Sequence, residues 1–441
     1  MFKTKKKIGI AVLLVLMFLS GSITGWWVFA NPGSPTWVLE QNSMSVCASY
    51  IIGRRDASTS YVRDGETGEI VFTNTTDVYT FAEARNLAYD DGGGLVFVRA
   101  GTYDFAGSSL GERNNVCWKG EGPATVITGE NKYMRAGNNS VFSNIKFDGV
   151  YIYCSEYAFV EVENVTITDC VFQDCDCGVK NIGSNSIVTH NRFFSIGNGA
   201  FDQEKVAIDV GRHCDNIEVS FNTFTDCDCN GEHAAVIVVD QASNIIVSFN
   251  TIHSGLKRGI SVYGDSRDCL VTQNIIHNRT LTGISLTALT GDSMLNVTLS
   301  GNHIYYCDDY AIKLISNGGY VNYTLIDGNH LVGQTIDISG LSKVVGTVFG
   351  DNKGFIAENN GLTTVANDEY VAHNIDSVLN VDESNSTVLV TPYTTVYDSV
   401  PVVVGCKAVN STHIQVSAYW TNGTAITVDA IQVWWNVKYS S

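Results

Sequence analysis

The stretch "VSFNTIHSGLKRGISVYGDSRDCLVTQNII", from Val247 to Ile276, decides the fold. It begins and ends with the same pattern: an apolar residue, two further residues, an asparagine, one more residue and an apolar residue. The two asparagines are Asn250 and Asn274. Between them, "GISV" begins at Gly259 and alternates apolar with polar residues, which is typical of a β-strand. The stretch therefore has the composition of one unit of a repeat.

The asparagine pattern recurs throughout the middle of the chain. A second pattern, Gly or Ala followed by apolar-x-apolar, precedes most of its copies. These short β-branched runs are separated by Gly, Asn, Asp and Ser, and they show no helical periodicity, so they predict a parallel β-helix solenoid. The units contain Asn144, Asn191, Asn222, Asn250, Asn274, Asn302, Asn329 and Asn352, with Cys170 replacing the asparagine in one unit.

Stacked coils would place equivalent residues about 4.8 Å apart, which is the spacing of neighbouring strands. Asparagines at the same place in every coil would then form an internal ladder. Each side-chain amide would bond to the next, so that no buried polar group stays unpaired. We expect Asn222, Asn250 and Asn274 to lie in one file.

The sequence Asp-Cys-Asp-Cys occurs twice, at 174–177 and at 226–229. Both copies fall at the same place in their units, two coils apart, so they should lie roughly 10 Å from each other. That is beyond the roughly 7 Å limit for the Cα atoms of a disulfide. We therefore expect the cysteines to point into the core and the aspartates to point outward. Some disulfides are still expected among the 12 cysteines of an exported chain, with connectivity left open.

Paired carboxylates on one face also suit a hard cation. A calcium site is the alternative interpretation of the two clusters, and calcium is the one cofactor that the sequence suggests. A thiolate-bound metal such as zinc is not expected, because no quartet of Cys or His has ligand spacing. The calcium ligands would be Asp174 with Asp176, or Asp226 with Asp228.

Residues 1–30 predict either a cleaved signal peptide or an uncleaved N-terminal membrane anchor. "MFKTKKK" is a basic start, and a long apolar run follows it. The bulk of the chain is therefore expected to be secreted or held at the cell surface. Nine N-x-S/T sequons fit a surface glycoprotein. After residue 30 the chain carries 23 basic and 45 acidic residues, which argues against nucleic acid as a partner.

"TFAEARNLAYDDGGGLVFVRAGTYDF" (80–105) and "WKGEGPATVITG" (118–129), together with the coils, resemble the right-handed parallel β-helix proteins of the pectin lyase-like superfamily, of the exported archaeal or viral surface type. The resemblance implies an amphipathic helix that caps the open end of the solenoid. Phe81, Ala84, Leu87 and Ala88 would supply its apolar stripe. The superfamily includes lyases, hydrolases, epimerases, tailspikes and non-enzymatic proteins, so the resemblance implies a fold more than a function.

The predicted fold class is all-β, with four segments. Residues 1–30 are the targeting segment and 31–75 a β-structured lead-in, in which "RDGETGE" is a hairpin turn. The parallel β-helix, with its N-terminal capping helix, spans 76–356. Residues 357–441 form a C-terminal antiparallel β-sandwich module. In the resembling proteins such modules often mediate attachment or trimerisation, so the resemblance implies a homotrimer.

In that superfamily, catalysis usually occurs on the outer face of the sheet built from the Gly-apolar-x-apolar strands. The register predicts that this face carries Lys180, Asp209, Ile237, Ser261, Ser285 and Lys313. The charged groups that concentrate on or beside it, and that are the candidate catalytic residues, include Asp209, Glu232, His233, Lys257 and Arg258.

These residues suit two chemistries. Asp209 with Glu232 could hydrolyse a glycosidic bond as a pair of carboxylates. Lys257 or Arg258 could instead abstract a proton beside a uronate carboxylate that calcium neutralises. The simpler interpretation is that polar residues outside a solenoid are only solvated. "CDDYAIKL" (307–314) resembles the paired-aspartate strand of polygalacturonase-like hydrolases, but that family's Gly-His-Gly and Arg-x-Lys elements are absent. We interpret this pair as a product of the repeat.

Three functions fit these observations. The first is an exported surface or virion-associated β-helix that binds a polysaccharide or cell-surface glycan for attachment, without turnover. The second is a polysaccharide-degrading enzyme, a glycoside hydrolase rather than a polysaccharide lyase, given the acidic chain. The third is a structural protein of the cell envelope.

Overall fold

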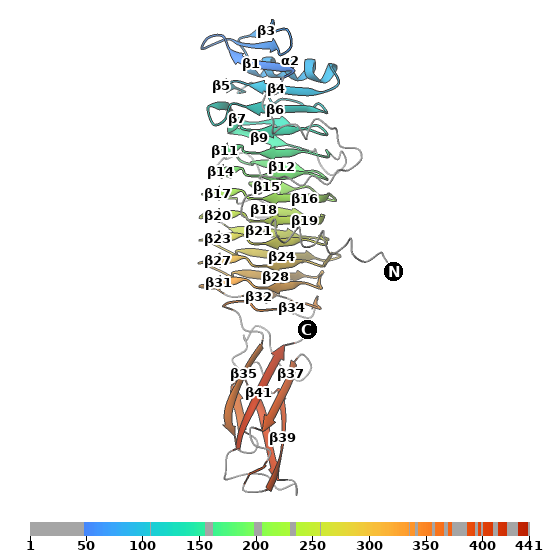
Figure 1. Ribbon diagram of the computed structural model, residues 1–441, viewed down its shortest axis with the longest axis vertical. Helices are drawn as coiled ribbons and strands as arrows, with labels where there is room; N and C mark the ends of the chain where they lie inside the picture. Colours follow the sequence, from blue (N-terminus) through green and yellow to red (C-terminus); the bar gives the residue numbers. More distant parts are fainter. Residues whose placement is uncertain are drawn as a thin grey trace, which may run out of the picture. The chain divides into compact units, whose positions relative to one another are not determined.

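The part of the chain that the structure describes is built almost wholly from β-strands (Figure 1). The computed structural model describes residues 48–105, 107–154, 162–197, 205–229, 235–255, 257–334, 336–339 and 343–354, and the backbone of seven strands after residue 357. The predicted targeting segment, 1–30, lies outside the described residues. Within the described part, no helix combines the length and the apolar character needed to cross a membrane.

The first strands form an antiparallel meander that joins the solenoid. β1 (Tyr50–Arg54), β2 (Ser60–Asp64) and β3 (Ile70–Asn74) pair in order, and the predicted hairpin joins β2 to β3. β1 also pairs in parallel with β4 (Gly94–Val98), the first strand of the coils.

Helix α2 (Asp77–Asp90) follows the meander and confirms the predicted capping helix. It buries Phe81, Ala84 and Ala88 completely. The Phe81 ring packs 5.0 Å from Phe105 and 5.6 Å from Trp118, between ring centroids. The apolar stripe of the helix therefore covers the open end of the core.

Each coil contributes strands to three parallel sheets, and Figure 1 shows the strands stacked in chain order along the solenoid. The first sheet runs on from β4 through β6 (Val116–Gly120), β8 (Val141–Ser143), β10 (Thr166–Thr168), β13 (Ile187–Thr189), β16 (Asp215–Ser220), β19 (Ser243–Ser248), β22 (Leu270–Thr272), β26 (Thr298–Ser300), β30 (Leu325–Asp327) and β34 (Val348–Phe349).

The second sheet contains the short strands that follow the repeated asparagines. Its members are β11 (Val171–Gln173), β14 (Arg192–Phe194), β17 (Thr223–Thr225), β20 (Thr251–His253), β23 (Ile275–His277), β27 (His303–Tyr305) and β31 (His330–Val332).

The third sheet contains the strands of the Gly-apolar-x-apolar pattern. Its members are β12 (Val179–Ile182), β15 (Ile208–Val210), β18 (Ala235–Asp240), β21 (Arg258–Tyr263), β24 (Ile284–Leu289), β28 (Ile312–Asn317) and β32 (Ile336–Ser339). β5 (Gly101–Asp104) pairs with the start of β7 (Thr125–Arg135), and β7 with β9 (Lys146–Tyr153). β9 pairs with both β11 and β12, so it belongs to the second and third sheets together. A small further sheet contains β25 (Ser293–Leu295), β29 (Tyr320–Asn322) and β33 (Val344–Val345).

The asparagine ladder is confirmed. Asn222, Asn250 and Asn274 are buried, and the backbone N–H of each donates to the Oδ1 of the asparagine one coil on, at 3.0 Å. The Nδ2 of each donates to the same oxygen and to a backbone carbonyl of the first-sheet strand one coil earlier. In the unit that has Cys170 instead, the backbone N–H of Cys170 still donates to Asn191 Oδ1, at 2.9 Å.

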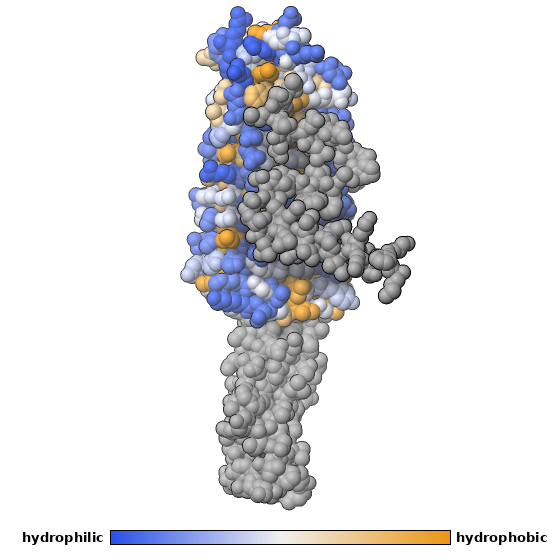
Figure 2. All heavy atoms as spheres, in the orientation of Figure 1, coloured by the Kyte–Doolittle hydropathy of each residue, from blue (hydrophilic) through white to orange (hydrophobic). Residues whose placement is uncertain are grey.

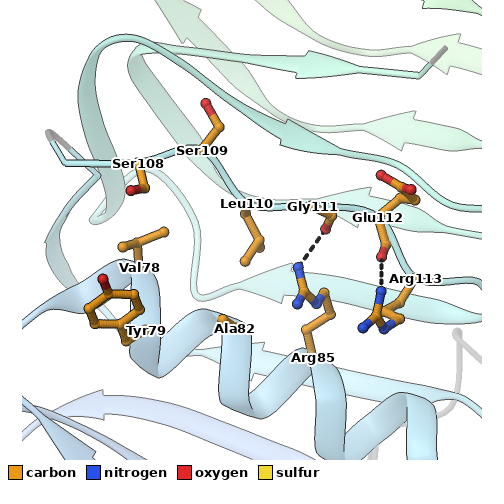
Figure 3. A pocket seen from close by; sticks show the side chains of 10 residues that line it. All are labelled: Val78, Tyr79, Ala82, Arg85, Ser108, Ser109, Leu110, Gly111, Glu112 and Arg113. Atoms are coloured by element: carbon orange, nitrogen blue, oxygen red, sulfur yellow. Dashed lines mark hydrogen bonds between the residues drawn. The ribbon is translucent and has the colours of Figure 1, made fainter. Parts of the chain in front are cut away.

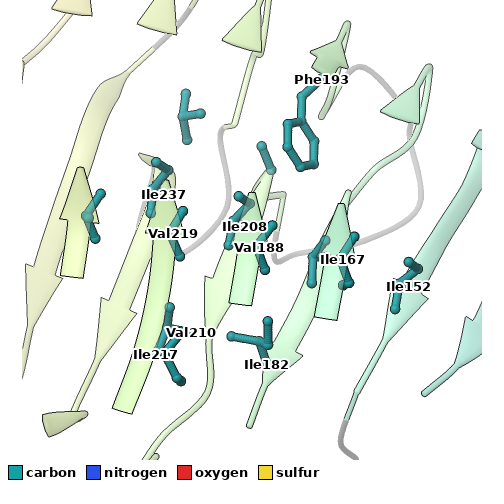
Figure 4. Packing of buried hydrophobic residues seen from close by; sticks show 14 of the residues in the cluster. Ile152, Ile167, Ile182, Val188, Phe193, Ile208, Val210, Ile217, Val219 and Ile237 are labelled. Carbon is teal, nitrogen blue, oxygen red and sulfur yellow. The ribbon is translucent and has the colours of Figure 1, made fainter. Parts of the chain in front are cut away.

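Like side chains also stack inside the core. The rings of Phe147, Phe172, Phe193 and Phe224 lie parallel in a column, with centroids 4.7 to 5.1 Å apart. Isoleucines and valines from all three sheets pack around that column (Figure 4). The repeat thus turns one apolar pattern into one continuous core.

The small residue that begins each Gly-apolar-x-apolar strand stands at a corner of the coil. A Cβ on Gly178 would lie 2.5 Å from Phe193 Cε1, and a Cβ on Gly283 would lie 2.5 Å from Ile304 Cγ2. Glycine fits these two corners because each lies against the core, while the equivalent corners of other coils hold Ala207, Val236 and Ala311.

The ten described cysteines are all free and buried, which confirms the inward orientation of both Asp-Cys-Asp-Cys pairs. Burial raises the pKa of the Cys170 and Cys227 thiols to about 12. The expected disulfides do not occur among these ten, because stacking places cysteines over other residue types, such as Ile196 between Cys175 and Cys227.

The prediction that the aspartates point outward is only partly right. Asp174 and Asp226 are exposed and Asp228 is half-buried, but Asp176 is 2% exposed. The strand ends at Gln173 and the chain turns before β12, so the alternation of an extended strand no longer applies at Asp176.

The backbone after residue 357 forms two antiparallel sheets. One contains β35 (Glu358–Val365), β41 (Ile431–Tyr439) and β37 (Ser386–Pro392). The other contains β36 (Glu369–Ala372), β40 (His413–Trp420), β39 (Val400–Ala408) and β38 (Val396–Tyr397). The change from parallel to antiparallel pairing marks the predicted C-terminal module.

Candidate functional site

The outer face of the third sheet carries a column of side chains, which the strand pairings define. We call it the outer column. Its middle members, Val238, Ser261 and Ser285, are buried, and the members at either end are half-buried. Where Figure 2 shows the described surface of the solenoid, hydrophilic residues dominate, with scattered hydrophobic ones. The outer column comprises Arg135, Tyr153, Lys180, Asp209, Val238, Ser261, Ser285, Lys313 and Asp337.

The predicted register of this face is wrong in one coil. Ile237 was expected to point outward, but it pairs with Ile208 and Ile260 in the core, and Val238 lies beside Asp209 instead. "AVIVV" offers no alternation between apolar and polar residues, so periodicity could not set its register.

The structure places three of the five candidate catalytic residues. Asp209 is half-buried in the outer column on β15. Lys257 and Arg258, at the start of β21, are also half-buried, and burial lowers the pKa of Arg258 while the nearby Asp309 opposes that shift. Glu232 and His233 lie outside the described residues, so the pair of Asp209 with Glu232 remains a prediction.

The candidate calcium ligands are not brought together as a site. Calcium takes six to eight oxygen ligands, and no group of three or more His, Cys, Asp or Glu side chains among the described residues is arranged to hold a metal ion. Asp174 is exposed while Asp176 is buried, and Asp226 accepts a hydrogen bond from Ser254 of the next coil at 2.6 Å. The calcium site at these residues therefore stays a prediction, without support from the described side chains.

Three tyrosines on the long strands β7 and β9 form a cluster at one end of the outer column. We call Tyr133, Tyr151 and Tyr153 the tyrosine cluster. Their ring centroids lie 5.4 to 6.3 Å apart, and the rings are tilted or edge-on to one another rather than stacked flat. All three side chains are half-buried, so part of each ring faces solvent.

Two cations border the tyrosine cluster. The guanidinium of Arg135 lies 5.4 Å from the Tyr153 ring centroid, and the ammonium of Lys180 lies 6.0 Å from it. These are cation–π distances, which stabilise the ring positions. The cluster was not predicted from the sequence, although "VYIY" (150–153) alternates apolar with aromatic residues. β7 and β9 precede the clear repeat units, so their outer face was not assigned.

The other end of the outer column carries ion pairs. Lys313 Nζ lies 3.3 Å from Asp309 Oδ2 and 3.5 Å from Asp337 Oδ2, over the ring of Tyr310. Asp309 is the second aspartate of the "CDDYAIKL" stretch, and Asp337 comes from the next coil. Local sequence does not join these two carboxylates, because only coil stacking brings β32 beside β28.

The outer face of the second sheet carries stacked rings instead. His253, His277 and Tyr305 lie in one file, with ring centroids 5.1 and 4.6 Å apart. Burial, and the neighbouring His253, lower the pKa of His277 below its ordinary 6.5.

This stack predicts a loss of stability in mild acid. The folded chain holds a proton on His277 less tightly than the unfolded chain does, so the unfolded state is favoured as the pH falls below about 6.5. We expect the melting temperature to fall from pH 7.5 to 5.5, and to fall less in a His277→Gln variant, as scanning calorimetry would show. Equal falls in the two proteins would contradict the prediction.

Comparison with known proteins identifies the class of protein. The sequence matches the family described as a right handed beta helix region over residues 105–265, 201–319 and 234–391. Together these matches span more than half of the chain, and the chain belongs to this right-handed β-helix family. No curated protein matches the sequence.

Several solved structures are similar. The A-module of a mannuronan C-5 epimerase from Azotobacter vinelandii is 16% identical, with a TM-score of 0.37, and the match covers 63% of this chain and 91% of that one. An alginate lyase from Paenibacillus is 14% identical, with a TM-score of 0.44 and coverages of 59% and 97%. A mutant tailspike protein of Escherichia coli bacteriophage HK620, in complex with a pentasaccharide, is 13% identical, with a TM-score of 0.40 and coverages of 89% and 98%.

Proposed function

We propose that this β-helix protein binds a glycan on the outer face of its third sheet, at the tyrosine cluster. The observation that carries the proposal is the set of three half-buried tyrosines, edge-on to one another and bordered by Arg135 and Lys180. A tyrosine offers an apolar ring to the C–H face of a sugar and a hydroxyl to its polar groups. Aromatic side chains are also the common anchors of binding sites.

The direction of the outer column supports an extended ligand. Successive members lie about 4.8 Å apart, so the half-buried members Arg135, Tyr153, Lys180 and Asp209 offer side chains in a line along this part of the solenoid. We propose that the glycan follows this line and that the protein acts in attachment, outside the cytoplasm, as residues 1–30 predict. A homotrimer stays a prediction that the measured mass of the purified protein would test.

Removing one ring of the cluster is expected to weaken glycan binding at least tenfold. The purified chain would be screened on a glycan panel, and the strongest ligand titrated into wild type and Tyr153→Ala, because loss of an aromatic anchor costs about 1.4 kcal/mol or more. Tyr320→Ala is the control, because Tyr320 is likewise a surface tyrosine near a lysine ammonium, 5.3 Å from Lys343, but stands on β29.

Two outcomes would contradict the proposal: no glycan binding by the wild type, or equal glycan affinities for Tyr153→Ala and Tyr320→Ala. The same mixtures, with and without calcium, would be assayed for new reducing ends and for absorbance from unsaturated uronates. Binding without product supports attachment. Recovery in envelope fractions without binding supports the structural alternative.

A hydrolytic function has one observation in its favour. Asp309 and Asp337 contact the same ammonium, so their oxygens lie no more than about 7 Å apart, which is compatible with the carboxylate separations of glycosidases. If reducing ends appear, we expect them to vanish in both Asp309→Asn and Asp337→Asn. Product that persists in both variants but vanishes in Asp209→Asn would place the reaction at Asp209 instead.

A further inference from the structure

A second concave site lies at the N-terminal end of the described solenoid, apart from the outer column. It is a pocket of about 280 Å³ between helix α2 and the segment that follows β5 (Figure 3). Its volume is close to the lower end of the range for small-molecule sites, roughly 300 to 1,000 Å³. The lining residues are Val78, Tyr79, Ala82, Arg85, Ser108, Ser109, Leu110, Gly111, Glu112 and Arg113.

Two guanidinium groups line this pocket, although the chain as a whole has a net charge of −18. Figure 3 shows the side chains of Arg85 and Arg113 beside each other, next to Gly111 and Glu112. Arg85 Nη1 donates to the Gly111 carbonyl at 2.7 Å, and Arg113 Nη1 donates to the Glu112 carbonyl at 3.0 Å. Arg85 Nη2 also donates to Asn86 Oδ1 at 2.9 Å, so both cations are held in place by neutral oxygens.

The single carboxylate of the lining forms its ion pair elsewhere. Glu112 Oε2 lies 3.2 Å from Arg135 Nη1, outside the pocket. A backbone hydrogen bond, and then the charges of Arg135 and Arg113, lower the pKa of Glu112. Burial lowers the pKa of Arg85, and the nearby charge of Arg113 lowers it further. Two cations that repel each other beside a cavity would be stabilised by an anion between them.

We propose that the pocket between α2 and the segment 108–113 binds a small oxyanion through Arg85 and Arg113. Guanidinium groups suit this role because their N–H groups match the oxygens of a carboxylate, a sulfate or a phosphate. The hydroxyls of Ser108 and Tyr79, at the exposed rim, are further donors. The oxyanion is either free in solution or carried by an acidic sugar, and the site does not depend on glycan binding at the tyrosine cluster.

The test is binding of sulfate and of glucuronate to the full chain. Melting temperature would be measured against each anion, with sodium chloride at matched ionic strength and neutral glucose as references. We expect a saturable rise in the wild type and at least a tenfold weaker apparent affinity in Arg113→Gln, because Arg113 is exposed and its loss should not impair folding. Arg192→Gln, on β14, is the matched control, since both arginines are exposed and each lies over an aromatic ring, Tyr89 for Arg113 and Phe194 for Arg192.

A rise with sulfate or with both anions supports a general oxyanion site, and a rise with glucuronate alone supports a sugar carboxylate as the ligand. In either case Arg192→Gln must show the same rise in melting temperature as the wild type. The proposal is overturned if neither anion gives a saturable rise beyond chloride, or if Arg113→Gln responds as the wild type does. A folded Arg85→Gln variant must lose the response as well.

Discussion

Replacing Arg279 by leucine is expected to lower the free energy of unfolding of the solenoid by about 3 to 5 kcal/mol. Arg279 is fully buried. Its guanidinium donates to the carbonyls of Ser254, of Lys257 at 3.4 Å and of Cys227 at 3.3 Å, and so links three successive coils. Leucine would fill part of the space but leave these buried carbonyls without their donors.

Arg279 occupies the same corner of its coil as Cys227 and Cys307, and as Ile196 in an earlier coil. Gly255 stands at that corner one coil earlier and leaves room for the long side chain. A Cβ on Gly255 would lie 2.5 Å from the Cys227 oxygen and 3.0 Å from Arg279 Nη1. Gly255→Ala should therefore destabilise the same three coils.

The measurement is urea unfolding followed by circular dichroism. The matched control is Arg267→Leu, because Arg267 is exposed and such surface changes usually stay within about 0.5 kcal/mol. If Arg279→Leu lowers the free energy of unfolding by less than about 1 kcal/mol, the guanidinium does not stabilise the contact between coils. Arg279→Lys should recover only part of the loss, since one ammonium cannot reach three carbonyls.

Replacing Asn274 by leucine is the second change with a large expected effect, a loss of about 3 to 5 kcal/mol. Asn274 Oδ1 accepts from both the backbone N–H and the Nδ2 of Asn250, each at 3.0 Å. Its own Nδ2 donates to Val247 O at 2.9 Å and to Asn302 Oδ1 at 3.0 Å. Leucine has nearly the same shape but can make none of these bonds, so two adjacent coils would keep buried groups unpaired.

Thermal unfolding and hydrogen exchange would measure this change. Exchange at the Asn250 amide should become faster, since its acceptor is lost, while amides in distant coils should change little because each coil contacts only its neighbours. Asn317→Leu is the control, because Asn317 is exposed at the end of β28. Similar melting temperatures for the two variants would mean that the ladder contributes little.

Much of the fold followed from local sequence. The spacing of the asparagines predicted the ladder, and the apolar stripe of Phe81, Ala84 and Ala88 predicted the cap. The repeated Asp-Cys-Asp-Cys predicted buried cysteines, because equal positions in successive coils receive equal surroundings. Where local alternation was absent, as in "AVIVV", the register was wrong by one residue.

The candidate site was predicted less well, because binding surfaces combine residues from several coils. Asp209, Lys257 and Arg258 do lie on or beside the outer face of the third sheet. The tyrosine cluster was missed, since its members come from β7 and β9, before the regular units begin. Asp337 and the pocket beside α2 were missed because each needs a neighbour that is distant in the chain.

The sequence by itself determined that the chain winds into coils and which side chains point to the core. The reason is that the same pattern of asparagines and apolar residues recurs in each unit. Only the tertiary structure decided which outward side chains meet, such as Tyr133 with Tyr153, Asp309 with Asp337 through Lys313, and Arg85 with Arg113. The physical reason is that whether a side chain is buried in the core depends on the local alternation of apolar and polar residues. Lateral contacts on the surface depend on how strands of different length are brought side by side by stacking.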